Sequence, residues 1–211
     1  MSNRREHLLD AAIQVLGERG VRALTHRAVD AQARVSAGST ANYFSTREAL
    51  FAAIVERFSE RERQNFDDLA VTMSVATPAE FGRAMGAFAR DSVGPNRTLT
   101  LSRYALLVES ANNPGLREQM AITGARVGAW VTNWLRLVGA TDPDRHVHVL
   151  GNYLTGLVLH QLAMPDPHFD PTDKIVSLLE SLITAETGDA PTQADTRTAR
   201  QPIATGGRHE S

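Results

Sequence analysis

Cysteine is absent from the sequence, which excludes structural disulfides, thiol catalysis, cysteine-ligated zinc and iron–sulfur clusters. There is no stretch of 18 apolar residues, and the acidic side chains of Glu6 and Asp10 interrupt the start of the chain. Neither a membrane-spanning helix nor a signal peptide is therefore expected. These absences predict a cytoplasmic protein without a membrane partner.

The sequence motifs of common enzyme classes are also missing. We find no Gly-x-Ser-x-Gly, Gly-x-Gly-x-x-Gly, Walker or His-Glu-x-x-His motif, and no glutamate stands three residues before a histidine. His146 and His148 are two positions apart and diverge on a helix, so they cannot chelate a metal together. The sequence therefore predicts a protein without catalytic activity, metal or cofactor.

Charge alone does not indicate nucleic-acid binding. The 211 residues carry 22 basic and 24 acidic side chains, and the fractions of hydrophobic (42%) and charged (22%) residues are those of a globular protein. Residues 1–60 hold eight arginines against seven acidic residues, so the front of the chain is slightly less acidic than the rest. This small difference is compatible with phosphate binding at that end.

The chain up to about residue 75 has the pattern of four helices. Apolar residues repeat at helical spacing over residues 4–19, and Gly20 follows where a helix C-cap belongs. Thr25 and Ser36 are typical N-caps for two short helices. A long helix is expected after residue 46, with Leu50, Phe51, Ile54 and Phe58 on its buried face and Arg57, Glu60, Arg61, Glu62 and Arg63 on its solvated face.

Prolines divide the rest of the chain into further helices. Proline is tolerated in the first turn of a helix and disfavours helix in the residue before it, so each Xaa-Pro pair indicates a stop and a new start. Helices are expected at about 78–93, 98–112, 114–139, 143–163 and 171–186, and no strand pattern is present. The chain is predicted to be all-α. Residues 187–211 contain one large aliphatic side chain, Ile203, and are predicted to be a disordered tail.

The two short helices suggest a DNA-binding function. Two such helices joined by a tight turn and laid on a longer first helix are the plan of the helix-turn-helix motif, whose second helix enters the major groove. Here that recognition helix is predicted at about residues 36–42. The alternative is an ordinary turn of small residues leading into a helix.

Specific residues strengthen this interpretation. They are Leu8-Leu9-Asp10-Ala11-Ala12, Gly20, Leu24-Thr25-His26-Arg27-Ala28-Val29, Ala33 through Phe44, and Arg47-Glu48-Ala49-Leu50. Together they resemble the N-terminal domain of the TetR family of bacterial transcriptional regulators over about residues 5–52. The resemblance implies a homodimer that binds a palindromic operator and a C-terminal domain that binds a small inducer and dimerises through its last two long helices. It implies a DNA-binding domain at 1–47 and a ligand-binding and dimerisation domain at 48–186.

The sequence departs from the family pattern in two places. The turn between the short helices usually holds glycine in this family, and here it holds Arg34. A left-handed conformation at Arg34 would cost about 1–2 kcal/mol relative to glycine. The recognition helix often carries a lysine or arginine near its start and a tyrosine in its middle, where this chain has Ala37 and Ala41.

DNA contacts are predicted from side-chain chemistry and from matching positions. The small residues at 36–39 let the helix N-terminus approach a phosphate, Asn42 can pair with adenine, and the Thr40 methyl can pack on thymine. Positions 25, 27, 43 and 47 match positions that contact the DNA backbone in the family, and His26 is expected either at the surface or on the backbone. The predicted set is Thr25, His26, Arg27, Ser36, Ala37, Gly38, Ser39, Thr40, Asn42, Tyr43 and Arg47.

The second domain holds enough aromatic and polar side chains to form a ligand site. The candidates are Phe88, Arg103, Tyr104, Trp130, Trp134, Tyr153 and His160. For each of them the alternative is a place in an ordinary core. Apolar stripes at 145–162, with Gly151 and Gly156, and at 175–183 are expected to pair about a two-fold axis in the homodimer.

These features predict a ligand-responsive repressor that binds a palindromic double-stranded DNA operator as a dimer and is released by a small-molecule inducer. Activation instead of repression stays open. The alternative is a dimeric helical ligand-binding protein without operator binding. Sequence-selective, salt-dependent duplex binding distinguishes the two.

Overall fold

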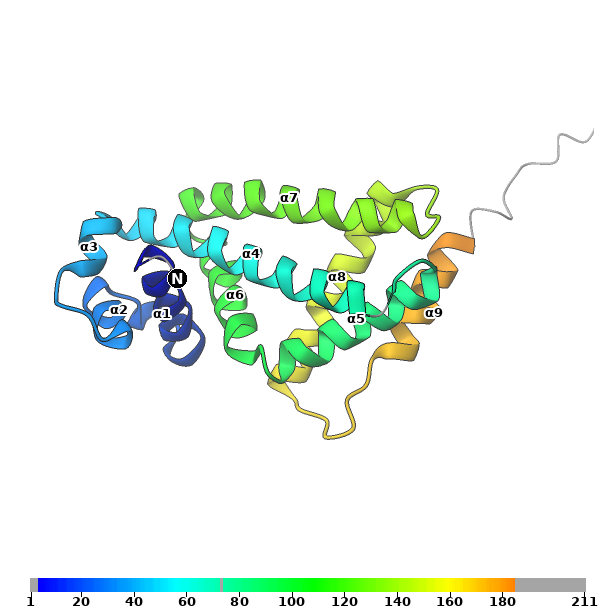
Figure 1. Cartoon of the computed structure of the whole chain (residues 1–211), viewed down its shortest axis with the longest axis horizontal. Helices are drawn as coiled ribbons and strands as arrows, with labels where there is room; N and C mark the ends of the chain where they lie inside the picture. The colour runs from blue at the N-terminus through cyan, green and yellow to red at the C-terminus, as the bar shows by residue number, and fades with distance from the viewer. Residues whose placement is uncertain (1–3, 73, 185–211) are drawn as a thin grey trace, which may run out of the picture.

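The computed structural model describes residues 4–72 and 74–184, and all regular structure in these ranges is helical (Figure 1). The all-α prediction is confirmed. The predicted tail at 187–211 lies outside the described residues. The helices, in order, are α1 (Arg4–Arg19), the 3-10 turn η1 (Val21–Ala23), α2 (His26–Ala33), α3 (Ser39–Tyr43), α4 (Arg47–Thr72), α5 (Pro78–Val93), α6 (Arg97–Ser110), α7 (Pro114–Leu137), α8 (Pro143–Ala163) and α9 (Thr172–Thr184).

Local capping explains why several helices begin where the proline pattern predicts. The side chains of Thr77, Asn113 and Asp142 each accept a hydrogen bond from a backbone N–H of the first turn of α5, α7 or α8, and proline follows each of them. At Thr77 the cap is reciprocal, because Glu80 accepts from the Thr77 N–H. These starts are therefore fixed by neighbouring residues.

The recognition helix starts later than the sequence predicts. Gly38 has a φ of +89°, so residues 36–38 form a turn and α3 begins at Ser39 with five residues. Ser36 is not its N-cap, since the Ser36 carbonyl instead accepts hydrogen bonds from the N–H and hydroxyl of Ser39. The left-handed glycine interrupts the helical backbone and shortens the helix.

Helix α4 connects two apolar clusters. In Figure 1, α1–α3 form one end of the molecule, and α4 runs from them alongside α7. The first cluster joins the inner face of α1 to Leu50, Phe51 and Ile54 of α4 and to Leu99 and Leu106 of α6. The first cluster therefore contains residues from both sides of residue 47, the predicted boundary between the two domains.

The second cluster lies between α4, α5, α7, α8 and α9. Ile175 and Leu179 of α9 are completely buried in it. Helix α9 approaches α5 so closely that a Cβ on Gly82 would lie 2.8 Å from the Val176 Cα. The predicted dimer stripes are thus partly used inside the chain: Leu150, Ile175 and Leu179 are buried, whereas Leu154, Leu157, Leu178, Leu182 and Ile183 are half-buried.

None of the helices described is long and apolar enough to cross a membrane.

Candidate nucleic-acid interface and ligand site

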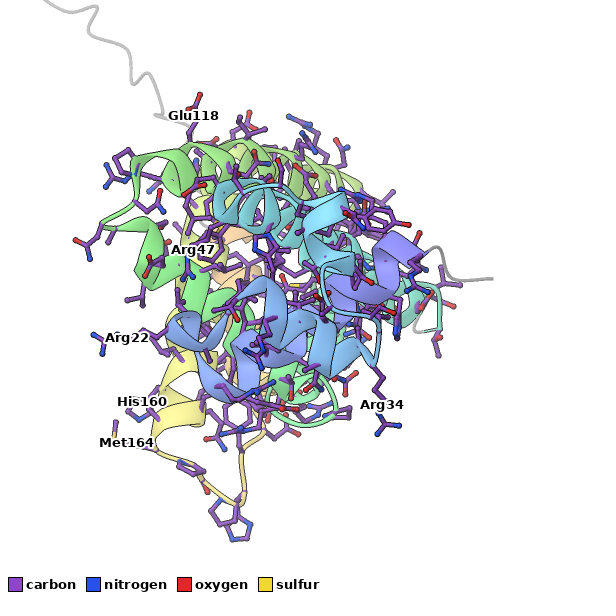
Figure 2. All side chains as sticks on the ribbon, turned by 90° about the vertical axis from the view of Figure 1, so that its left-hand side faces the viewer. Arg22, Arg34, Arg47, Glu118, His160 and Met164 are labelled. Carbon is purple, nitrogen blue, oxygen red and sulfur yellow. The ribbon has the colours of Figure 1, made fainter. Side chains whose placement is uncertain are left out.

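At the helix-turn-helix end, which faces the viewer in Figure 2, α3 has one exposed face. Asn42 is exposed, and its side chain has no hydrogen-bond partner within residues 4–72 and 74–184. The Tyr43 side chain is also exposed, and Ser36, Ala37 and Gly38 form an exposed turn before the helix. These predicted DNA contacts therefore lie on one accessible surface, and their contact with DNA stays a prediction.

Thr40 does not belong to that surface. It is completely buried, its hydroxyl donates to Asp30 Oδ1 at 2.5 Å, and its backbone N–H donates to the same oxygen at 2.7 Å. The predicted packing of its methyl on thymine is wrong, because the side chain points into the protein. Nothing in the local pattern marked Thr40 as buried, since its partner stands ten residues earlier.

The N–H groups at the start of α3 are also occupied. Gly38 N–H donates to Asp30 Oδ2 at 2.8 Å and Ser39 N–H donates to the Ser36 carbonyl. With the Thr40 N–H held by Asp30, these three N–H groups are not free for the predicted phosphate contact. Burial by itself raises the pKa of Asp30, but the hydrogen bonds from Thr40 and Gly38 outweigh it and hold the pKa below its usual value.

His26 is half-buried and has an internal partner. Its Nε2 donates to the Phe44 carbonyl at 2.6 Å. His26 was expected at the surface or on the DNA backbone, and the structure adds this internal partner. The side chain joins the start of α2 to the end of α3.

The other residues predicted to contact the DNA backbone differ in whether their side chains already have partners within the protein. Thr25 is exposed and caps α2 through its hydroxyl, as predicted. Arg27 is exposed and has no hydrogen-bond or ion-pair partner among the described residues. Arg47 donates to the carbonyls of Leu24 and Val21 at 2.8 and 3.0 Å, so it fastens α4 to the segment before α2.

Arg34 adopts the left-handed conformation, with φ 54° and ψ 46°. The turn therefore keeps its geometry without glycine. In Figure 2 the Arg34 and Arg22 side chains extend outward from the domain, whereas Arg47 lies against it. Arg4, Arg22, Arg27 and Arg34 are all exposed and have no ion-pair partner in the ranges described, so this end carries cationic side chains that are free to meet an anionic partner.

The predicted ligand residues fall into three places. Phe88, Trp130 and Trp134 surround Phe66 of α4, with ring centroids 6.1, 4.9 and 5.8 Å from its own. Phe81 is a further neighbour at 5.9 Å. The sequence pattern did not single out Phe66, because its aromatic partners come from other helices.

Arg103 and Tyr104 lie beside an acidic residue that was expected on a solvated face. Arg103 Nε is 3.4 Å from Glu62 Oε1, and the Tyr104 hydroxyl donates to the Thr155 carbonyl at 2.6 Å. Burial raises the pKa of Glu62 in spite of the nearby guanidinium. The prediction of a solvated Glu62 is wrong, because α4 is covered on that side by α6.

Tyr153 and His160 instead line a cavity of about 520 Å³ between α8 and the start of α9, together with Asn152 and Lys174. A larger groove of about 720 Å³ runs between α7 and α8 and is lined by small and apolar residues such as Gly128, Gly151 and Leu154. The seven predicted residues thus do not form one site. The part of the chain described contains no cluster of three or more His, Asp or Glu side chains suited to a metal.

Comparison with known families matches both halves of the chain. Residues 8–54 match the bacterial regulatory proteins of the tetR family, and residues 76–185 match the Tetracyclin repressor-like C-terminal domain. The HTH-type transcriptional regulator BetI of Rhizobium meliloti (strain 1021) is 28% identical over 162 residues, which cover 75% of this chain and 77% of BetI.

Solved structures agree with these matches. The multidrug binding protein EbrR complexed with ethidium is 27% identical, covers 86% of this chain and 99% of its own, and superposes with a TM-score of 0.64. A TetR-family member from Streptomyces coelicolor A3 is 26% identical over 86% of this chain and 99% of its own, with a TM-score of 0.67. A putative TetR-family regulator from Rhodococcus sp. has a TM-score of 0.72 at 18% identity, covering 87% and 100% of the two chains, and supports the fold alone.

Members of this family are DNA-binding transcriptional regulators and not enzymes, in agreement with the sequence prediction. The chain belongs to the TetR family of bacterial transcriptional regulators.

Proposed function

We propose that this regulator is a cytoplasmic, ligand-responsive repressor that binds a palindromic operator as a homodimer and is released by a small molecule. In this proposal residues 1–47 bind DNA and residues 48–186 bind the ligand and dimerise. The observation that carries it is the exposed face of α3, which includes Asn42 and Tyr43, on a domain that also exposes arginines without an ion-pair partner among the described residues.

Asn42 is the residue proposed to read sequence. Its amide can accept from adenine N6 and donate to adenine N7, and no arginine or lysine on α3 competes for guanine. Thr25, Arg27 and Tyr43 are proposed to contact phosphates and so to place the domain on the duplex. Arg47 donates to two backbone carbonyls and so holds the start of α4 against the segment before α2.

The aromatic cluster around Phe66 is the proposed ligand site. EbrR has been solved with ethidium, proflavin and malachite green, which are cationic aromatic dyes. Phe66, Trp130 and Trp134 supply aromatic rings, and the half-buried Glu62 supplies a carboxyl group on the same helix as Phe66. Phe66 is 1% exposed, so a ring can enter only if these side chains move. Ligand binding then favours a different conformer of α4.

The outward side of α8 is the proposed dimer face. Val149, Asn152, Gly156 and Leu159 recur at helical spacing and are all exposed. Gly156 has nothing within 4 Å of its Cβ position, which leaves room for close approach of a second helix. Burying this face would cover apolar side chains that the single chain leaves in water.

Selection of bound duplexes from a random library tests the proposal. The expected result is a palindrome whose half-sites are about 34–36 Å apart, one turn of the duplex. Recovery of random sequences only would contradict operator binding. An aromatic cation that fails to release the selected duplex would contradict the ligand assignment.

A further inference from the structure

Helix α3 is attached to α2 at both of its ends by side chains of α2, the buried Asp30 and the half-buried His26. Resting on the proposed role of α3 in the major groove, we infer that Asp30 and His26 are positioning residues for DNA recognition: they fix the placement of α3 without contacting DNA. The contacts with Gly38, Thr40 and Phe44 carry this inference.

The N-terminal attachment replaces a cap that α3 lacks. Its N-cap residue is Gly38, which has no side chain, and a helix of five residues is too short to be stable by itself. Asp30 supplies both carboxylate oxygens, one to the Gly38 N–H at 2.8 Å and one to the Thr40 N–H and hydroxyl. A negative charge at this end also suits the helix dipole.

The C-terminal attachment comes from the same helix one turn earlier. His26 stands four residues before Asp30, so both side chains lie on one face of α2. His26 Nε2 donates to the carbonyl of Phe44, the residue that ends α3. The two ends of α3 therefore move with α2.

The Thr40 attachment also sets the rotation of α3 about its own axis. Successive residues of a helix are rotated by about 100°. With Thr40 held inward by Asp30, Ala41, Asn42 and Tyr43 face outward. Without that attachment the amide of Asn42 has no fixed direction toward a base edge.

Asp30→Asn tests the inference because electrostatics and the positioning role predict opposite changes in affinity for the operator. The variant removes a negative charge, which by electrostatics alone strengthens binding to any duplex. It also places an amide NH₂ against the N–H donors of α3. We expect affinity for the duplex enriched by the wild-type protein to fall about tenfold, the effect of losing hydrogen bonds to a charged group. Affinity for a scrambled duplex of the same composition should stay constant or rise. Equal or tighter binding of both duplexes would overturn the inference.

A matched pair at Thr40 keeps the test valid if Asp30→Asn does not fold. Thr40→Val keeps the shape and loses the hydroxyl, whereas Thr40→Ser keeps the hydroxyl. We expect Thr40→Val to reduce the ratio of the affinity for the operator to the affinity for the scrambled duplex, and Thr40→Ser to preserve this ratio. Equal ratios for the two variants would contradict the inference. Ile54→Val, a buried change in α4, supplies the stability control. If it lowers the ratio as much at the same loss of Tm, the ratio follows stability and not the position of α3.

His26→Ala and His26→Gln complete the experiment. Positioning predicts a lower operator preference for Ala, rescue by Gln through its amide donor, and an unchanged salt dependence of binding. A direct phosphate contact would instead reduce the salt slope by about one.

A wild-type protein that enriches no duplex would contradict the proposed function and not this inference. Amide hydrogen exchange at Thr40 then still tests it: exchange should be faster in folded Asp30→Asn than in the wild type. Unchanged exchange would overturn the attachment of α3 by Asp30.

Discussion

The two ends of the molecule are held together by different interactions. At the DNA-binding end, short helices are positioned by hydrogen bonds from Asp30, His26 and Arg47 over an aliphatic core. At the other end, long helices enclose aromatic rings grouped around Phe66. Hydrogen bonds fix direction closely, whereas the edge-to-face ring contacts around Phe66 are less directional. The first arrangement suits reading a rigid duplex, and the second suits a cavity that opens for a ligand.

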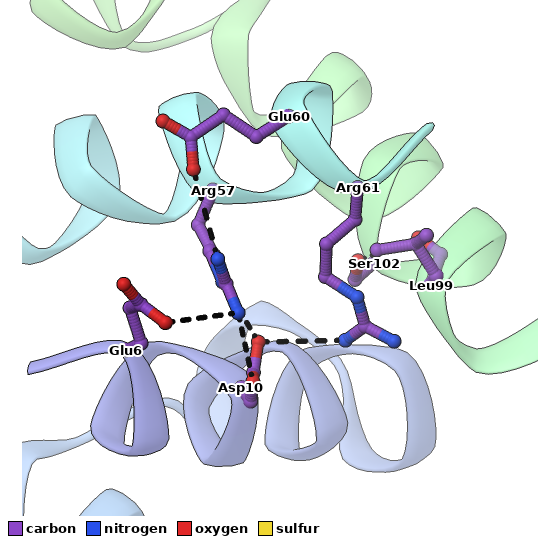
Figure 3. A network of polar contacts seen from close by, with 7 residues as sticks. All are labelled: Glu6, Asp10, Arg57, Glu60, Arg61, Leu99 and Ser102. Atoms are coloured by element: carbon purple, nitrogen blue, oxygen red, sulfur yellow. Dashed lines mark hydrogen bonds and ion pairs between the residues drawn. The ribbon is translucent and has the colours of Figure 1, made fainter. Parts of the chain in front are cut away.

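A charged and tightly packed junction connects the two ends. Arg57 of α4 binds the Asp10 carboxylate of α1 through two hydrogen bonds of 3.0 and 3.1 Å, and Glu6 and Glu60 flank it (Figure 3). Nearby, α1 packs on α6 so closely that a Cβ on Gly17 would collide with the Thr98 carbonyl oxygen. We therefore propose that any movement of α4 or α6 that accompanies ligand binding reaches α1 through these contacts.

The largest loss of stability is expected in the second apolar cluster, where α9 packs on α5. Leu179→Glu places a charge where the wild-type side chain is 0% exposed, at a cost of several kcal/mol. The second region should unfold, seen as a loss of helicity by circular dichroism. The matched variant Leu159→Glu, on an exposed residue of α8, should stay folded and become monomeric in light scattering. A folded Leu179→Glu, or a dimeric Leu159→Glu, would contradict this account of the two stripes.

The junction should be the next most sensitive place. Gly17→Ala forces α1 and α6 apart, because the new methyl group meets backbone and not a flexible side chain. A loss of about 1–3 kcal/mol in the free energy of urea unfolding is expected. Gly124→Ala in α7 has open space and should gain about 0.5–1 kcal/mol from the lower entropy of the unfolded chain. Similar losses for both variants would mean that the α1–α6 contact is not close.

A substitution in the left-handed turn at Arg34 should stabilise the protein, in contrast to Leu179→Glu and Gly17→Ala. Arg34→Gly relieves the backbone strain and should raise the free energy of unfolding by about 1 kcal/mol. Arg34→Ala removes the same charge but keeps the strain, so it should bring no such gain. If the two variants are equally stable, the effect comes from the loss of the Arg34 charge and not from relief of backbone strain.

The ion pairs of the junction should contribute least. Asp10 is partly exposed, so Asp10→Asn should cost no more than about 1 kcal/mol, and less at high salt. Arg63→Gln removes an exposed pair with Asp67 within one helix and should cost about 0.3–0.5 kcal/mol. Urea titrations at low and high salt check both values, and a salt-independent loss at Asp10 would show a packing role instead.

The helices were predictable because their ends depend on adjacent residues. Thr77, Asn113 and Asp142 stand directly before the prolines that start α5, α7 and α8, so a short window of sequence contains the whole signal. The late start of α3 was missed, because whether Gly38 adopts a positive φ depends on where the Asp30 carboxylate lies.

The candidate sites were predictable only in part, for a related reason. Asn42 and Tyr43 were identified as surface residues of a short helix, and they are exposed. Thr40 and Glu62 resemble polar surface residues in sequence, but their partners Asp30 and Arg103 stand 10 and 41 positions away. Pairings of this kind arise from tertiary packing, which periodicity does not encode.

Binding-site selection with Asn42→Ala tests most directly the claim that the hydrogen-bonded end reads DNA through α3. The wild-type protein should enrich a palindrome, and the variant should lose its preference at one A·T pair in each half-site, worth about 1–3 kcal/mol, while the rest of the motif is retained. An unchanged motif from the Asn42→Ala protein would contradict the claim.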